Sequence, residues 1–229
     1  MFPLFYDPTM IILIPAMILA VYAQSKVKGT YEKYRRVYNK RGITGAQVAQ
    51  DIMRRNGLNL PIEMISGVMT DHYDPRSKVL RLSSEVYNGT SVSSCAIAAH
   101  EVGHAIQDDR EYYPLRFRNS LVPVANIGSQ LSMIFIMVGL FIPRLLFFLD
   151  IGILLFTAAV LFQIVTLPVE FNASSRAIDQ LEEVRVFDAD ELKMGKKVLD
   201  AAALTYVAAT VSAISQLIRL LIIRDSRDD

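Results

Sequence analysis

Two histidines and a glutamate stand together in the stretch AIAAHEVGHAI. His100 and His104 are four residues apart, and Glu101 follows the first histidine. On an α-helix, positions i and i+4 lie one turn apart on the same face, so the two imidazoles can reach one metal ion. Glu101 is rotated by about 100° from His100, which places its carboxylate beside the metal, where a general base for a water molecule belongs. This is the H-E-x-x-H pattern of zinc hydrolases, and its apolar flanks argue against a chance match on a surface helix.

A third metal ligand must come from elsewhere in the chain, because a catalytic zinc usually keeps three protein ligands and one open position. His72 is the only other histidine. The longer motif with a third histidine six residues after the second is excluded, because Arg110 stands there. A carboxylate on a nearby helix is the other standard solution. Glu170 is the best candidate, because its neighbours are apolar or small.

Other acids near the C-terminus fit a ligand role less well than Glu170. They lie in a polar, like-charged run that is typical of an exposed helix face; these are Glu182, Glu183 and Asp188. Glu170 itself has an alternative interpretation as an acid at the start of a helix, where the helix dipole favours negative charge.

The composition indicates a membrane protein. The chain has 229 residues, of which 52% are hydrophobic. Charges are absent from residues 8–25, 119–143, 151–169 and 201–218, and about 20 mostly apolar residues suffice for a helix to cross a bilayer. The first and last of these blocks also fit buried core helices. The net charge of +1 gives no reason to expect nucleic-acid binding, and a single cysteine excludes an internal disulfide or a multi-cysteine zinc site.

The distribution of positive charge predicts the orientation. Seven cations follow the first apolar block, between Lys26 and Arg41, and Arg116 and Arg118 precede the second. Such clusters mark the cytoplasmic side of a membrane. The second and third apolar blocks then form a hairpin that turns at Pro143. Because two crossings return the chain to the side it left, Glu170 is expected on the same side as the histidines.

We therefore expect a mostly α membrane protein, with about four transmembrane helices and a small α+β zincin-like catalytic domain in the cytoplasm, built from two segments. The segments are an N-terminal transmembrane helix (1–25), a catalytic segment with the HEVGH helix (26–121), a transmembrane hairpin (122–167), a second catalytic segment that begins with the helix of Glu170 (168–200), and a C-terminal membrane helix and tail (201–229).

Local signals place the smaller elements. Two capping boxes predict helix starts, and two short β-type runs predict strands joined by a turn. The boxes are Thr44 with Gln47 and Asp188 with Glu191; the strands are 62–69 and 78–82, with the turn at 71–75; and the metal-motif helix is expected from Ser91 or Ser93 to about Asp109.

Together these residues resemble a known family, the bacterial membrane-embedded neutral zinc metallopeptidases. The resemblance rests on HEVGH at 100–104, on EFNASSRA from Glu170, on DHYDPRSKVLRLS at 71–83, and on the hydrophobic hairpin. It covers essentially the whole chain. The family is similar to the heat-shock membrane protease and the CaaX prenyl protease group, all of the gluzincin type. The resemblance implies His100, His104 and Glu170 as zinc ligands and Glu101 as catalytic base.

The sequence departs from the wider prenyl-protease pattern at one position. In that pattern an aspartate stands four residues after the ligand glutamate and orients a histidine, whereas this chain has Ser174. Asn172 and Asp179 are the residues considered as substitutes.

The mechanism of such a site also needs a second donor for the tetrahedral oxyanion. Arg176 and His72 are the candidates. The alternatives are that Arg176 pairs with an acid such as Glu101 or Asp179 and that His72 is a turn residue. Substrate is expected to pair as an extended strand with an exposed sheet edge, to which the strand at 78–83 is expected to contribute.

The sequence thus predicts a membrane-anchored zinc endopeptidase with Zn²⁺ as cofactor, at the cytoplasmic face of the cell membrane. We expect protein or peptide substrates, with membrane-protein segments among those considered, a lipid bilayer and no nucleic acid as partners. The alternative from another class is a non-catalytic membrane scaffold or adaptor that keeps a zincin-like fold. An intramembrane zinc protease is disfavoured, because Glu85, Asp108 and Asp109 flank the uncharged run around His100.

Overall fold

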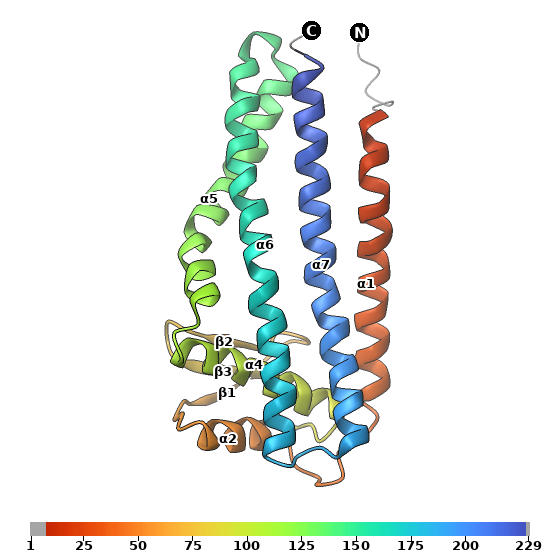
Figure 1. The fold of residues 1–229 in the computed structure, drawn as a ribbon, viewed down its shortest axis with the longest axis vertical. Helices are drawn as coiled ribbons and strands as arrows, with labels where there is room; N and C mark the ends of the chain where they lie inside the picture. Colours follow the sequence, from red (N-terminus) through yellow and green to blue (C-terminus); the bar gives the residue numbers. More distant parts are fainter. Residues whose placement is uncertain (1–7, 228–229) are drawn as a thin grey trace. The chain divides into compact units, whose positions relative to one another are not determined.

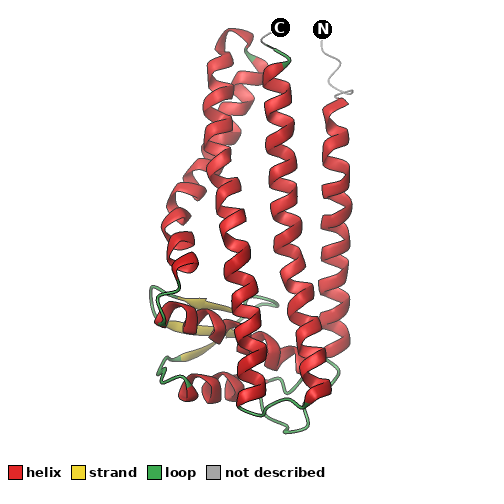
Figure 2. Cartoon of the chain, in the orientation of Figure 1, coloured by secondary structure: helices red, strands yellow, loops and turns green. Residues whose placement is uncertain are grey.

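A computed structural model describes residues 8–227 of the chain. Residues 1–7 and 228–229, at the outer ends of the predicted first and last segments, lie outside the described residues. The helices are α1 (Leu13–Tyr34), α2 (Gly45–Arg55), α3 (Ser84–Asn88), α4 (Val92–Asp109), α5 (Tyr113–Phe141), α6 (Leu146–Glu183) and α7 (Ala189–Asp225); short 3-10 turns cover Pro8–Ile12 and Pro143–Leu145, and the strands are β1 (Ile62–Ile65), β2 (His72–Asp74) and β3 (Val79–Ser83) (Figures 1 and 2).

The expected fold class is confirmed. Among the described residues, four helices are long and apolar enough to cross a membrane: Pro8–Tyr34, Tyr113–Phe141, Leu146–Glu183 and Ala189–Asp225. Their apolar side chains remain largely exposed to the surroundings, as lipid-facing helices require. The sheet is small, and most of the chain is helical (Figure 2).

The described chain forms two compact units. Within the described residues, one consists of 8–23, Arg116–Leu167 and 205–227, and the other of Gln24–Leu115 and Pro168–Leu204. In the first unit, α5 and α6 approach closely at Gly139. A Cβ added to this glycine would lie only 2.4 Å from the backbone nitrogen of Leu149. Small residues permit this kind of packing between membrane helices. The ion pair of Arg224 with Asp150, at 2.9 Å, links α7 to the start of α6.

The second unit has a continuous hydrophobic core around α4. Buried side chains of α2, β3, α4, α6 and α7 meet there, and they include Ile52, Leu82, Val102, Leu181 and Leu199. Both faces of α4 are therefore covered over most of its length. Small residues of α4 allow these close neighbours, and Ala96, Ala98, Ala99 and Ala105 are all buried.

The capping boxes are confirmed. The Thr44 hydroxyl accepts a hydrogen bond from the Gln47 amide, and the Gln47 side chain accepts one from the Thr44 amide. At the start of α7, the side chains of Asp188 and Glu191 each accept a hydrogen bond from the other's amide at 2.9 Å. A capping residue satisfies amide groups that have no partner inside the helix.

The sheet differs from the sequence expectation. Its order is β1-β3-β2, with β1 parallel and β2 antiparallel to β3. The strand predicted at 78–83 is therefore the central strand and cannot offer an exposed edge, so that expectation was wrong. Residues 72–74, predicted as part of a turn, form the edge strand β2. Both β2 and β3 contact α4 (Figure 1).

Helix α6 also differs from expectation. Residue 168 was predicted to begin a new helix, but α6 continues through Pro168 to Glu183 without interruption. Proline costs one hydrogen bond within a helix, and α6 accommodates this loss at Pro168. Glu170 therefore lies in a helix interior, and the alternative interpretation of it as a helix-start acid was wrong.

Gly103 allows α4 and α6 to approach closely within the second unit. A Cβ at Gly103 would lie 2.7 Å from the carbonyl oxygen of Ala173. This atom belongs to the backbone of α6 and cannot move aside as a flexible side chain would. The crossing of α4 and α6 thus requires glycine at this position.

We expect Gly103→Ala to lower the free energy of unfolding by about 1–3 kcal/mol, the usual cost of overpacking a core. Gly29→Ala in α1 is the matched control, because a Cβ there meets nothing within 4 Å and alanine is the better helix former. Denaturant unfolding of the detergent-solubilised protein measures both. Equal stability of Gly103→Ala and wild type would contradict the tight crossing.

Candidate metal centre

Helix α4 places His100 and His104 on one face. The helix begins after Ser91, whose hydroxyl accepts a hydrogen bond from the amide of Ser94 at 3.1 Å. Both histidines lie in its interior, where the helical spacing is regular. Their ring centroids are 4.8 Å apart and the rings are nearly perpendicular, at 83°. In this edge-to-face arrangement both Nε2 atoms face the same carboxylate oxygen, Oε2 of Glu170.

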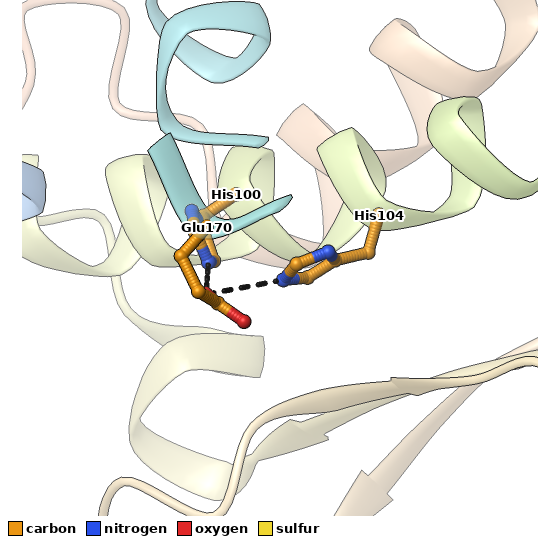
Figure 3. A group of neighbouring side chains, drawn as sticks. All are labelled: His100, His104 and Glu170. Carbon is orange, nitrogen blue, oxygen red and sulfur yellow. Dashed lines mark ion pairs between the residues drawn. The ribbon is translucent and has the colours of Figure 1, made fainter. Parts of the chain in front are cut away.

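Glu170 completes the group (Figure 3). Its Oε2 atom lies 3.3 Å from Nε2 of His100 and 3.5 Å from Nε2 of His104. The side chain comes from α6 and is 4% exposed. One ligand atom from each of the three residues lies within 4.8 Å of the other two. Among the described residues, His100, His104 and Glu170 thus form a group that could hold a metal ion.

The ligand types and the distances from Glu170 to the two histidines fit a zinc ion. Imidazole nitrogens and carboxylate oxygens bind zinc at about 2.0–2.2 Å, and a tetrahedral arrangement then sets ligand atoms about 3.3–3.5 Å apart. The two distances between Glu170 and the histidines agree with this separation. Two nitrogens and one oxygen also form a ligand set used by catalytic zinc sites, which keep the fourth position for water.

The charges in this group favour a cation. Burial lowers the pKa of His104, but the hydrogen bond and negative charge of Glu170 outweigh it, so that the pKa lies above its ordinary value. A buried carboxylate next to two imidazoles therefore stabilises positive charge at their meeting point. A metal ion bound between the three side chains would supply that charge without a proton.

Glu101 lies outside the group of three and is held by the sheet. Its Oε2 atom accepts a hydrogen bond of 3.1 Å from the backbone amide of Tyr73 in β2. The Tyr73 hydroxyl in turn donates to Asp108 of α4 at 2.7 Å. Tyr73 thus attaches β2 to α4 at two points, one of them the Glu101 carboxylate. Sequence reasoning missed this residue because residues 71–75 were interpreted as a turn.

The histidines are oriented by polar side chains on their far sides. The Nδ1 atom of His100 lies 3.2 Å from the hydroxyl of Ser174. The Nδ1 atom of His104 lies 3.0 Å from Oε1 of Gln107. Such contacts fix the ring orientation of a metal-binding histidine. Ser174, the position that departs from the prenyl-protease pattern, therefore contacts a histidine itself.

Of the two substitutes considered at sequence level, Asn172 joins this network and Asp179 is exposed. The Oδ1 atom of Asn172 accepts hydrogen bonds from Gln107 at 2.9 Å and from Arg176 at 2.7 Å. The contact of Gln107 with His104 could not be predicted from the sequence, because a glutamine three residues after the motif is equally compatible with an exposed helix face.

The two candidate oxyanion donors lie outside the group of three. Arg176 donates from Nε to Asn172, and its guanidinium lies 5.9 Å from the ring centre of Tyr112. His72 is exposed in β2, where its Nδ1 lies 2.8 Å from the carbonyl oxygen of Thr70. Their role as oxyanion donors stays a prediction.

The acids set aside at sequence level lie elsewhere. Glu183 pairs with Arg55 at 2.9 Å, and Asp188 pairs with Lys40. Glu182 is exposed. The like-charged run is therefore a solvent-facing surface, as the sequence predicted.

Comparison with known proteins shows the family to which the chain belongs. The model of the family described as "Putative neutral zinc metallopeptidase" matches residues 9–225, and the chain belongs to this family. A relative from Bacillus subtilis (strain 168), named "Putative membrane protease YugP", is 44% identical over 218 residues, which cover 94% of this chain and 96% of the relative. No solved structure matches. The chain is therefore a multi-pass membrane protein of a zinc peptidase family.

We expect Glu170→Gln to abolish high-affinity zinc binding, because the amide offers a weaker, neutral ligand and a donor group where a cation should lie. Zinc content after dialysis against a weak chelator measures this. Glu182→Gln, on the exposed side of the same helix, is the control and should keep one zinc ion per chain. Retention of zinc by both variants would remove Glu170 from the ligand set.

Proposed function

We propose that this protein is a membrane-anchored zinc endopeptidase of the gluzincin type, with His100, His104 and Glu170 as metal ligands. The observation that carries the proposal is the convergence of three ligand atoms within 4.8 Å of one another, with Oε2 of Glu170 at 3.3 and 3.5 Å from the two imidazole nitrogens. Two histidines from one helix and a glutamate from a second helix define the ligand pattern. Membership of a zinc peptidase family supports it.

Glu101 acts as the general base in this proposal. A zinc ion held by the three ligands would polarise the scissile carbonyl and lower the pKa of a water molecule. Glu101 accepts the proton from that water and delivers it to the leaving amine. The hydrogen bond from Tyr73 occupies Oε2 of Glu101, which restricts the rotation of the carboxylate, and in this proposal Oε1 takes the proton. Its exposure of 9% limits competition from bulk water.

The substrate-binding edge in this proposal is β2. The strand lies at the border of the sheet, and the Tyr73 amide points away from β3, toward Glu101. A peptide in extended conformation can pair along such an edge through its main chain, independently of its sequence. This arrangement would bring a peptide bond next to the general base. It replaces the earlier expectation that residues 78–83 form the edge.

We place the site on the cytoplasmic side. The support is the cluster of seven cations after the first span, between Lys26 and Arg41, with Arg116 and Arg118 before the second. The hairpin of α5 and α6 then returns the chain to the same side. A site in the cytoplasm has access to the cytoplasmic loops and ends of membrane proteins, which are the proposed substrates.

Glu101→Gln tests the mechanism. We expect peptide hydrolysis to fall by about 100- to 10,000-fold, the usual contribution of a general base, while zinc stays bound because Glu101 is not a ligand. A fluorogenic peptide library and zinc analysis of the purified protein measure the two properties. Full hydrolysis by this variant would refute the assignment of the base, and a zinc-free native protein would support the scaffold alternative.

Single cysteines test the orientation. Gln50→Cys lies on the exposed side of α2, and Arg144→Cys at the exposed turn of the hairpin. In intact cells we expect a membrane-impermeant maleimide to label position 144 but not position 50, and both after lysis. Background reaction is low, because Cys95 is buried and burial raises the pKa of its thiol to about 12. The reverse labelling pattern would place the site outside the cell.

A further inference from the structure

Gln107 is a fully buried polar side chain. It is 0% exposed, lies three residues after His104 in α4, and uses its amide on both sides. The Oε1 atom contacts Nδ1 of His104 at 3.0 Å, and the Nε2 atom donates to the carbonyl oxygen of Val169 at 2.8 Å and to Asn172 at 2.9 Å. Burying an amide is costly in free energy unless the amide is hydrogen-bonded. The Gln107 side chain therefore depends on these partners to remain buried.

The contacts of Gln107 determine which way its amide points. The carbonyl oxygen of Val169 can only accept a hydrogen bond, so the NH₂ group of Gln107 must face α6. The amide oxygen then faces His104. Because that oxygen can only accept, Nδ1 of His104 must carry the proton. In the neutral ring, Nε2 then keeps its lone pair on the side of Glu170, which is the form of the ring that binds a metal ion.

Gln107 also reaches the turn of α6 that carries Glu170. Val169 directly precedes this glutamate, and Asn172 follows it by two residues. Asn172 is itself fixed, since its Oδ1 atom also accepts a hydrogen bond from Arg176 at 2.7 Å. One side chain therefore connects the His104 ring with the backbone just before Glu170 and with the Asn172 side chain just after it.

We infer that Gln107 is a positioning residue: it holds His104 in its metal-binding tautomer and fixes the position of the His104 ring relative to Glu170. This inference rests on the proposed zinc site and adds a requirement to it. Without the Gln107 oxygen, the Nδ1 proton of His104 has no acceptor in a buried place, which is costly. The tautomer with the proton on Nε2, bonded to Glu170, then becomes favoured and competes with the metal.

Gln107→Met is the direct test, because methionine has a similar length and no hydrogen-bonding group. We expect zinc affinity to fall by about 10- to 100-fold, as for other residues that orient metal-binding histidines. Zinc is titrated into the metal-free, detergent-solubilised protein in competition with a chromophoric chelator. Gln50→Met, on the exposed face of α2, is the control and should bind zinc as wild type does.

Asn172 provides a pair of variants that separates orientation from general loss of stability. Asn172→Asp keeps the accepting oxygen and should retain the wild-type affinity, whereas Asn172→Leu removes it and should weaken binding. The absorption spectrum of bound Co²⁺, which reports on ligand geometry, should change for Gln107→Met and Asn172→Leu but not for Asn172→Asp. A global loss of stability would not alter the spectrum of the fraction that binds.

The outcomes are distinguishable. If wild type binds no zinc, the proposed site itself fails and the role of Gln107 fails with it. If wild type binds zinc and Gln107→Met binds it equally well with an unchanged Co²⁺ spectrum, only the positioning role is overturned. If Gln107→Met does not fold, the two Asn172 variants decide: equal affinities for the aspartate and leucine variants overturn the inference.

Discussion

The close crossing of α4 and α6 is the constraint on which the site depends. At Gly103 the two backbones approach so closely that a Cβ would lie 2.7 Å from the Ala173 carbonyl oxygen. The histidines of α4 lie on either side of this contact, and Glu170 lies one turn before Ala173. The separation of the ligands is therefore set by backbone packing between two helices. Side chains on rigid elements are held more accurately than side chains on loops.

Buried polar groups impose a second constraint on the same region. Glu101, Gln107 and Glu170 are each less than 10% exposed, and a buried polar group is costly unless it has a partner. The amide of Tyr73, the ring of His104 and the backbone of α6 supply these partners. An arrangement that satisfies all of them at once is rare, so the network selects one packing of β2, α4 and α6. Stability of this unit and geometry of the site are thereby linked.

Features determined by neighbouring residues were predictable from the sequence. The HEVGH helix, both capping boxes and the four apolar helices depend on spacing within a few residues or on long uncharged runs. Features determined by distant contacts were not. Pro168 looked like the start of a helix, because proline prefers the first turn, and nothing in the neighbouring residues indicated that α6 continues through it. The pairing of residues 72–74 with β3, and the contacts of Ser174 and Gln107 with the histidines, depend on which helix faces meet.

The continuity of α6 has a consequence for biosynthesis. The two histidines are translated before the hairpin, whereas Glu170 is translated only after α5 and the membrane part of α6. A nascent chain that ends before this point carries the familiar motif but only two of the three ligands. Under the proposed function, the order of the segments therefore delays the assembly of a complete hydrolytic centre until the membrane hairpin has been made.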